Sequence, residues 1–325
     1  PRWRGVDQHA AVSMTDDPQA RARLTRSAAF ASIAMALLLV GMKVWAVLKT
    51  DSTAMLGSLA DTGLDLIASV ATLIGVWIAA QPADAEHRFG HGKAEALAAM
   101  FQVVLISLSA FGLAFRGVSQ LLAGERVAAA DEGIVVSLIA IAATFVLLWW
   151  QRHVIRETGS LAIKTDNVHY KSDLFLNLGV IAALVLDRYL GIAGADPLFG
   201  LAIALWLAWG AYRASLEAID HLMDKEWPDE KREQFLAVLA KHPELKGVHD
   251  LRTRTSGAHD FVQFHAMVNG RMTVAEAHTV MDELEERIER EFPGVEVLIH
   301  PDPEGLVNET GSAAEELLPG LAESD

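Results

Sequence analysis

The chain of 325 residues contains no cysteine. This absence excludes disulfide bridges and every metal site that depends on thiolate ligands. Basic residues are also few, since 27 lysines and arginines stand against 42 aspartates and glutamates, which gives a formal net charge of -15. Such an acidic balance argues against nucleic acid as a partner, because phosphates select basic surfaces. Any metal bound by this chain must therefore be held by histidine, aspartate and glutamate.

The sequence also lacks a nucleotide-binding loop. No glycine-rich segment follows an expected strand, and the run GHGKAE does not have the spacing of a P-loop. We therefore do not expect an enzyme. Apolar residues are abundant instead, at 52% of the chain with a mean hydropathy of +0.26. This content is too high for an ordinary soluble domain and indicates a membrane portion.

Six apolar runs long enough to cross a bilayer lie before residue 222. They are Ser27–Leu48, Thr53–Ala80, Ala94–Leu122, Gly133–Trp150, Asp166–Leu190 and Pro197–Ile219. Lysine and arginine gather before the first run, between the second and third, between the fourth and fifth, and after the sixth. By the positive-inside rule, both termini are expected in the cytoplasm.

The sequence changes character after the sixth run. Residues 223–303 alternate between amphipathic helical patterns and short strand patterns in the order αββαβ, which predicts a small α+β domain. Thr273 followed by Glu276 has the spacing of a capping box and predicts a helix start. Residues 1–26 are expected to form a disordered polar leader without a cleavable signal peptide, residues 27–222 the six-helix membrane domain, and residues 304–325 an acidic disordered tail.

Two pairs of polar residues interrupt the apolar runs at helical spacing. Asp61 and Asp65 are four residues apart in the second run, and His169 and Asp173 are four apart in the fifth, so each pair shares one helix face. The acids could simply be satisfied by neighbours or face water. A carboxylate in a bilayer is costly, however, and usually has a function. Three carboxylates and one imidazole fit a tetrahedral Zn²⁺ site.

Such a site predicts competition between metal and protons. Binding requires a neutral imidazole and ionised carboxylates, so metal binding releases protons. The imidazole of His169 has a reference pKa of about 6.5 and titrates in the physiological range. If the helices alternate between inward-open and outward-open arrangements, this competition becomes an exchange of metal for protons.

Two further sets of candidate ligands lie outside the runs. Asp84, His87 and His91 follow the second run at the spacing D-x₂-H-x₃-H, which fits either a weak metal site or a solvated loop. The C-terminal domain carries a larger set, in which each residue alone would be read as a surface or packed side chain. Its members are His249, His265, His278, His300 and Asp302. Asp302 could bridge two ions, since one carboxylate has two oxygens.

Together these segments resemble the cation diffusion facilitator family, most closely its bacterial zinc/proton antiporters. The resemblance is carried by SLADTGLDLIAS, PADAEHRFGHGKAEALAA, HYKSDLFLN, GVHDLRTRTSG, VQFH, EAH and IHPDP, and it extends from the first run to about Pro303. It implies a homodimer in the bacterial inner membrane, with six transmembrane helices and a ferredoxin-like cytoplasmic domain in each subunit.

The resemblance also implies roles for particular residues. Asp61, Asp65, His169 and Asp173 would form the transport site; Asp84, His87 and His91 a loop site; and the five ligands of the C-terminal domain a two-zinc site that steadies the dimer. Lys93 and Asp224 would form a charge interlock. One departure concerns Pro301, which stands where relatives often carry glutamine and which offers no side-chain oxygen to a metal.

These observations predict export of Zn²⁺, with Cd²⁺ as a surrogate, in exchange for protons. Fe²⁺ and Mn²⁺ are the rival substrates, but harder ions prefer more oxygen ligands than the site offers. A membrane-anchored metal sensor is a further alternative, against which the acids of the second run argue, because an anchor needs none. A passive channel would require weaker, multi-site binding than a closed tetrahedral cage provides.

Overall fold

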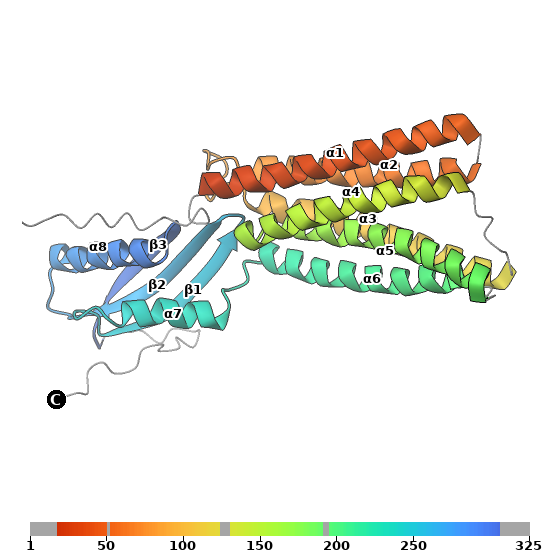
Figure 1. Cartoon of the computed structure of the whole chain (residues 1–325). Helices are drawn as coiled ribbons and strands as arrows, with labels where there is room; N and C mark the ends of the chain where they lie inside the picture. Colours follow the sequence, from red (N-terminus) through yellow and green to blue (C-terminus); the bar gives the residue numbers. More distant parts are fainter. Residues whose placement is uncertain (1–17, 51–52, 124–130, 191–194, 306–325) are drawn as a thin grey trace, which may run out of the picture. The chain divides into compact units, whose positions relative to one another are not determined.

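The structure is a computed structural model that describes residues 18–50, 53–123, 131–190 and 195–305. It divides into two compact units, Gln19–Leu222 and the part that begins at Met223. Figure 1 shows the helices of the first unit running side by side along their length. These helices are α1 (Pro18–Thr50), α2 (Thr53–Ala79), α3 (Lys93–Ala123), α4 (Asp131–Thr158), α5 (Leu161–Leu190) and α6 (Ala195–Leu222).

In the first unit, large apolar side chains lie on the outer surface and small or polar side chains lie between the helices, which is the reverse of a soluble helical bundle. In α3 the buried positions hold mainly small or polar residues, such as Ala99, Gln102 and Ala110. The opposite face of the same helix exposes large apolar side chains, including Phe111 at 73% and Phe115 at 66%. A surface of this kind is stable in lipid, and small residues allow the helix backbones to approach one another closely inside.

Five helices are long and apolar enough over their described residues to cross a membrane. The exception is α5, whose first half carries several polar side chains. These side chains carry the site described below, so their presence does not argue against a membrane position. With α5 included, the unit has the six transmembrane helices that the sequence predicts.

The helices extend beyond the apolar runs at the end that includes the α4–α5 turn. Helix α1 already begins at Pro18, so residues 18–26 are helical rather than part of a disordered leader. Proline suits the first turn of a helix, where its missing N–H is not needed. Helix α5 begins at Leu161, five residues before the expected start of the fifth run. Hydropathy finds only the segment in lipid, whereas the backbone hydrogen bonds continue past it.

Helices α2 and α3 approach each other closely at Gly75. A Cβ atom added to Gly75 would lie 2.3 Å from the Cβ atom of Ala98 and 3.1 Å from the carbonyl oxygen of Ala94. Only glycine fits at this position without displacing backbone. The contact therefore fixes the spacing between the two helices in the half of the bundle that includes the loop from α2 to α3.

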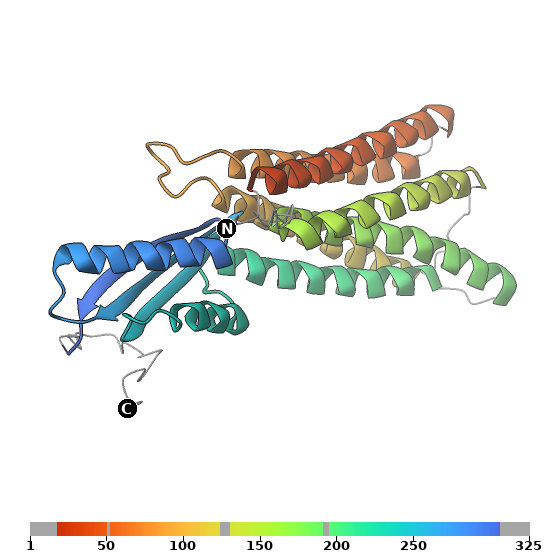
Figure 2. The same cartoon turned by 60° about the vertical axis from the view of Figure 1, so that its left-hand side comes forward.

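The second unit contains a three-stranded sheet with two helices (Figure 2). Its elements are α7 (Asp229–Leu239), β1 (Gly247–Ser256), β2 (His259–Val268), α8 (Val274–Glu291) and β3 (Val295–Pro303). The strand order is β1-β2-β3, with β1 antiparallel and β3 parallel to β2. The parallel pair requires a crossover, and α8 provides it. The predicted αββαβ order is confirmed.

Alternation along the strands separates a core face from an open face. Val262, Phe264 and Ala266 of β2 are buried in one cluster with residues of both helices, such as Phe235 and Leu284. Because side chains of a strand alternate between faces, the intervening residues of β2 point to the other side of the sheet. Both helices thus cover one face, and the histidines of the strands belong to the opposite face.

The helix ends of this unit follow from local sequence. The capping box predicted at Thr273 is present: its hydroxyl accepts a hydrogen bond from the N–H of Glu276, whose carboxylate accepts one from the N–H of Thr273 in return. These hydrogen bonds lower the pKa of the exposed Glu276, with the N–H of Thr273 as the main cause. Pro228 directly precedes the first residue of α7, and its fixed φ favours a position at the start of a helix.

Candidate metal centre

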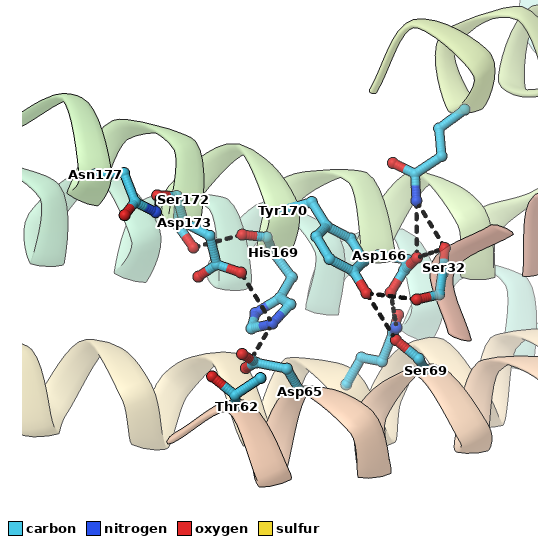
Figure 3. A network of polar contacts seen from close by, with 12 residues as sticks. Ser32, Thr62, Asp65, Ser69, Asp166, His169, Tyr170, Ser172, Asp173 and Asn177 are labelled. Carbon is cyan, nitrogen blue, oxygen red and sulfur yellow. Dashed lines mark hydrogen bonds and ion pairs between the residues drawn. The ribbon is translucent and has the colours of Figure 1, made fainter. Parts of the chain in front are cut away.

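The structure brings together three of the four side chains that the sequence places in the membrane site. Asp65 lies on α2, and His169 and Asp173 lie one turn apart on α5 (Figure 3). Nε2 of His169 is 2.9 Å from Oδ1 of Asp65 and 3.7 Å from Oδ2 of Asp173. One ligand atom from each residue lies within 4.8 Å of the other two, which is close enough to share one ion.

The imidazole of this site fits a cation. His169 is 7% exposed, and its Nε2 has no hydrogen-bond partner of acceptable geometry in the described part of the chain despite its closeness to Asp65. A buried polar nitrogen is costly unless a partner satisfies it. A metal ion between Asp65 and Asp173 would supply that partner. Asp61 lies on the same helix as Asp65, one turn earlier, but its side chain is outside the described residues.

Sequence reasoning missed a buried polar network beside this site, also drawn in Figure 3. Its centre is Asp166, one turn before His169 on α5 and 0% exposed. The carboxylate accepts three hydrogen bonds, from Ser32 Oγ at 2.6 Å, Gln151 Nε2 at 2.8 Å and Gln102 Nε2 at 3.0 Å. Each donor comes from a different helix, so no local spacing reveals the network.

A lysine near the opposite side of the site was missed as well. Lys43 on α1 donates a hydrogen bond from Nζ to the hydroxyl of Thr62, three residues before Asp65 on α2. The sequence analysis gave Lys43 no role, although this residue lies within an apolar run. Its position inside a membrane span was the available signal, because intramembrane ionisable residues are rare.

The loop between α2 and α3 gathers its three candidate ligands. Asp84 Oδ1 lies 3.3 Å from His87 Nδ1, and its Oδ2 lies 3.4 Å from His91 Nε2. Asp84 also accepts hydrogen bonds from the N–H groups of Glu86 and His87, which holds the turn. The N–H of His87 is the main cause of a lowered pKa for this carboxyl. Asp84 and His87 are more than half exposed, so this site is open to water.

The open face of the sheet carries the third group. His249 on β1 pairs with His265 on β2 in the sheet register, and Asp302 lies on β3. One oxygen of Asp302, Oδ2, is 3.1 Å from His249 Nε2 and 2.7 Å from His265 Nδ1. Neither ring nitrogen of the buried His249 has a hydrogen bond of acceptable geometry within the described residues. The three residues offer ligand atoms within 4.8 Å of one another and fit a metal ion.

The other two candidates in this unit differ from each other. Nε2 of His300 lies 3.4 Å from Oδ1 of Asp302, whereas the distances to His249 and His265 are to Oδ2 of the same carboxylate. Asp302 thus offers one oxygen to each side, as a bridging carboxylate would. His278 lies on α8 with its Nε2 3.7 Å from Asp282, and it is not part of the group of three.

Asp250 and Pro301 lie next to the group formed by His249, His265 and Asp302. Asp250, which the sequence analysis did not consider, has a φ of 49° beside a register shift in β1, and its carboxylate lies 3.9 Å from His265 Nε2. Pro301 lies in β3, a strand at the edge of the sheet, and pairs with Ala266 of β2. Proline is tolerated at a sheet edge because its missing N–H interrupts no further ladder.

The proposed charge interlock involves residues of separate units, and each has partners in its own unit. Lys93 at the start of α3 donates a hydrogen bond to the carbonyl oxygen of Leu222 at 3.2 Å. Asp224 has a φ of 56° and lies 3.7 Å from an Arg254 guanidinium nitrogen. The interlock between Lys93 and Asp224 stays a prediction.

Comparisons with known proteins match both units. Residues 29–223 match the family model of the cation efflux transmembrane domain, and residues 227–304 match that of the cation efflux protein cytoplasmic domain. A solved structure of CzrB in its zinc form is 40% identical to this chain and covers 26% of it and 97% of the CzrB chain, with a TM-score of 0.25.

Whole-length relatives give the same result. The cation-efflux pump FieF of Klebsiella pneumoniae is 41% identical over 289 residues, which is 89% of this chain and 96% of the relative. FieF of Pectobacterium atrosepticum is 41% identical over 288 residues, again 89% of this chain and 96% of the relative. With both domains and nearly the full length matched, the chain belongs to the cation diffusion facilitator family, as a cation-efflux protein of the FieF type.

Proposed function

We propose that this cation-efflux protein exports Zn²⁺ from the cytoplasm in exchange for protons, by alternating access to the site formed by Asp65, His169 and Asp173. The observation that carries the proposal is the convergence of two carboxylates and a buried imidazole, from two helices, within 4.8 Å. Asp61 is the proposed fourth ligand. A nitrogen ligand and a small number of oxygens suit Zn²⁺ better than Mg²⁺, Ca²⁺ or Mn²⁺.

Proton exchange follows from the ligand chemistry. Metal ligands must be deprotonated, so each ion that binds displaces the protons that the empty site holds. A protonated His169 would replace the metal's positive charge between Asp65 and Asp173, from which its Nε2 is 2.9 and 3.7 Å away. The same side chains can therefore hold either cation but not both, which is the requirement for exchange.

The remaining parts have supporting roles in this proposal. Residues 27–222 form the transport domain in the bacterial inner membrane, with both termini cytoplasmic, and residues 223–303 form the cytoplasmic domain. The loop group captures metal transiently, because Asp84 and His87 are exposed. The group around Asp302 binds structural Zn²⁺ that steadies a homodimer.

Reconstitution into liposomes tests the proposal. Zinc should accumulate in the vesicles only with a pH gradient, and His169→Ala or Asp65→Asn should abolish uptake. His153→Ala is the matched control, because this exposed histidine of α4 lies outside the site. Zinc uptake into liposomes that contain the His169→Ala variant, or uptake that does not depend on the pH gradient, would contradict the proposal. Competition with Fe²⁺ and Mn²⁺ at equal concentration identifies the preferred ion.

A further inference from the structure

Asp166 is an intramembrane carboxyl that the metal site does not use. It is 0% exposed, lies within α5 and belongs to none of the three groups of candidate metal ligands. A charge buried in a membrane span is costly unless it is compensated. The groups that bond directly to this carboxyl are a hydroxyl and two amides, all of them neutral. A negative charge on Asp166 can therefore be compensated only by charged groups farther away.

The titratable groups near Asp166 lie mostly on its own helix. Those that interact with it electrostatically are His169, Tyr170 and Asp173. The helices packed against it present neutral side chains to the network: Ser32 from α1, Ser69 and Thr72 from α2, Gln102 from α3 and Gln151 from α4. Of the three titratable neighbours, only His169 can carry a positive charge.

The charge around Asp166 then changes with the occupant of the metal site. A divalent ion places two positive charges between Asp65 and Asp173, one helical turn from Asp166. When the ion leaves, a protonated His169 provides one positive charge among three carboxyls. Negative charge is least tolerated where burial is complete. Asp166 is more completely buried than Asp65 or Asp173, which are both partly exposed.

The network itself is short of one donor. The side-chain oxygen of Gln102, Oε1, is buried without a hydrogen-bond partner in the described part of the chain, and the residue is 1% exposed. Its amide nitrogen donates both to Thr72 and to Asp166. A proton on Asp166 would add a donor to this cluster, and Oε1 of Gln102 would accept it after a rotation of the side-chain amide.

We propose that Asp166 is a proton-binding site outside the metal ligands, which carries a proton when the metal site is empty and releases it when the metal binds. In this step the O–H bond of the acid breaks, the electron pair stays on the carboxylate, and the proton passes to water. The inference rests on the proposed exchange of metal for protons and adds a second proton carrier to it.

Proton release during zinc binding tests this inference. Zn²⁺ is added to the full-length protein in detergent and weak buffer, and the protons released per bound zinc are counted with a pH indicator. Asp166→Asn should release fewer protons than the wild type, by up to one per zinc, while it still binds zinc. The matched control is Ser32→Ala, which removes a hydrogen bond to the same carboxyl but no proton, and its count should not change.

The outcomes separate this inference from the proposed function. No proton release from the wild type would overturn both. Equal release from the wild type and Asp166→Asn would overturn only the role of Asp166. If Asp166→Asn does not fold, infrared difference spectra give the answer: zinc should remove the C=O band of a protonated acid, and Ser32→Ala should shift that band. A missing band, or one that Ser32→Ala leaves in place, would also overturn the inference.

Discussion

The hydroxyl oxygens of Tyr170 and Ser69 lie 3.1 Å apart and connect α5 to α2, one residue after His169 and four residues after Asp65. The Tyr170 hydroxyl also donates a hydrogen bond to the carbonyl oxygen of Ser32 on α1 at 2.9 Å. The tyrosine is 0% exposed. A direct contact thus sets the distance between the two helices that supply the metal ligands.

Tyr170→Phe should therefore destabilise the membrane domain and weaken zinc binding. The substitution leaves the ring in place but removes two buried hydrogen bonds, for a cost of about 1–3 kcal/mol in the free energy of unfolding. Thermal unfolding in detergent and zinc titration calorimetry measure the two effects. Tyr212→Phe is the control, since Tyr212 is 54% exposed. An equal loss of stability in both variants would refute the explanation.

The contribution of Asp84 to metal binding by the loop should be lost only in acid. The pKa of Asp84 is lowered from 3.8, chiefly by the N–H of His87, so this carboxylate stays ionised until the pH falls through that lowered value. Metal ligands must be deprotonated, so the contribution of Asp84 to zinc binding is present above pH 3.8 and disappears as the pH falls through the lowered value. Equilibrium dialysis against Zn²⁺ at a series of pH values measures this loss, and Asp84→Asn should not show it.

Two substitutions in this loop isolate the site. Asp84→Asn should lower the zinc stoichiometry of the protein at neutral pH, as measured by elemental analysis after equilibrium dialysis. Glu86→Gln should not, because Glu86 contacts Asp84 through its backbone N–H rather than its side chain. If the two variants lose zinc equally, general surface charge rather than a defined site holds the ion.

Metal should protect the sheet of the C-terminal domain against hydrogen exchange. An ion that binds only the folded state stabilises it, by about 2.7 kcal/mol at one hundred times the dissociation constant. Amide exchange in β1, β2 and β3 of the full-length protein should slow when Zn²⁺ is added. His265→Ala should remove this protection, whereas His259→Ala, at the exposed start of β2, should retain it. Protection that survives in His265→Ala would exclude the site.

The capping box of α8 should contribute stability that is lost in acid. The pKa of Glu276 is lowered from 4.5, mainly by the N–H of Thr273, so the folded state favours the ionised carboxylate. The contribution is present above pH 4.5 and disappears as the pH falls through the lowered value. Thr273→Ala should accelerate exchange in the first turn of α8. Glu285→Ala, at an exposed position beyond the first turns of the same helix, serves as the control and should leave that turn unchanged.

Helical spacing was sufficient to predict which polar residues of each run lie together. His169 and Asp173 are four residues apart, so any helix places them on one face, and Asp65 is an acid in an apolar run. The meeting of α2 with α5 was not contained in either segment alone, and it was inferred from the complementary ligand types of the two runs and from the family resemblance. The order of strands was predictable as well, because alternation and turn residues are local signals.

The missed residues are those whose function depends on distant partners. Asp166 is the first residue of the expected fifth run, Asp166–Leu190, and a polar residue at the end of an apolar run is typical of the membrane interface. Its three donors come from three other helices, one each, and a single glutamine or serine in an apolar run has no periodicity to reveal it. Asp250 depends similarly on a register shift in β1, which the alternating pattern does not encode.

The close approach at Gly75 bears on how the proposed metal site would open. A carbon atom added to Gly75 of α2 would meet Ala98 of α3, so the two helices are in close contact at this level. In the proposed transport cycle we expect this pair to move as one unit, with Asp65 travelling on it. The ligands of a single ion, divided between α2 and α5, would then be brought together or separated by movement of the pair against α5.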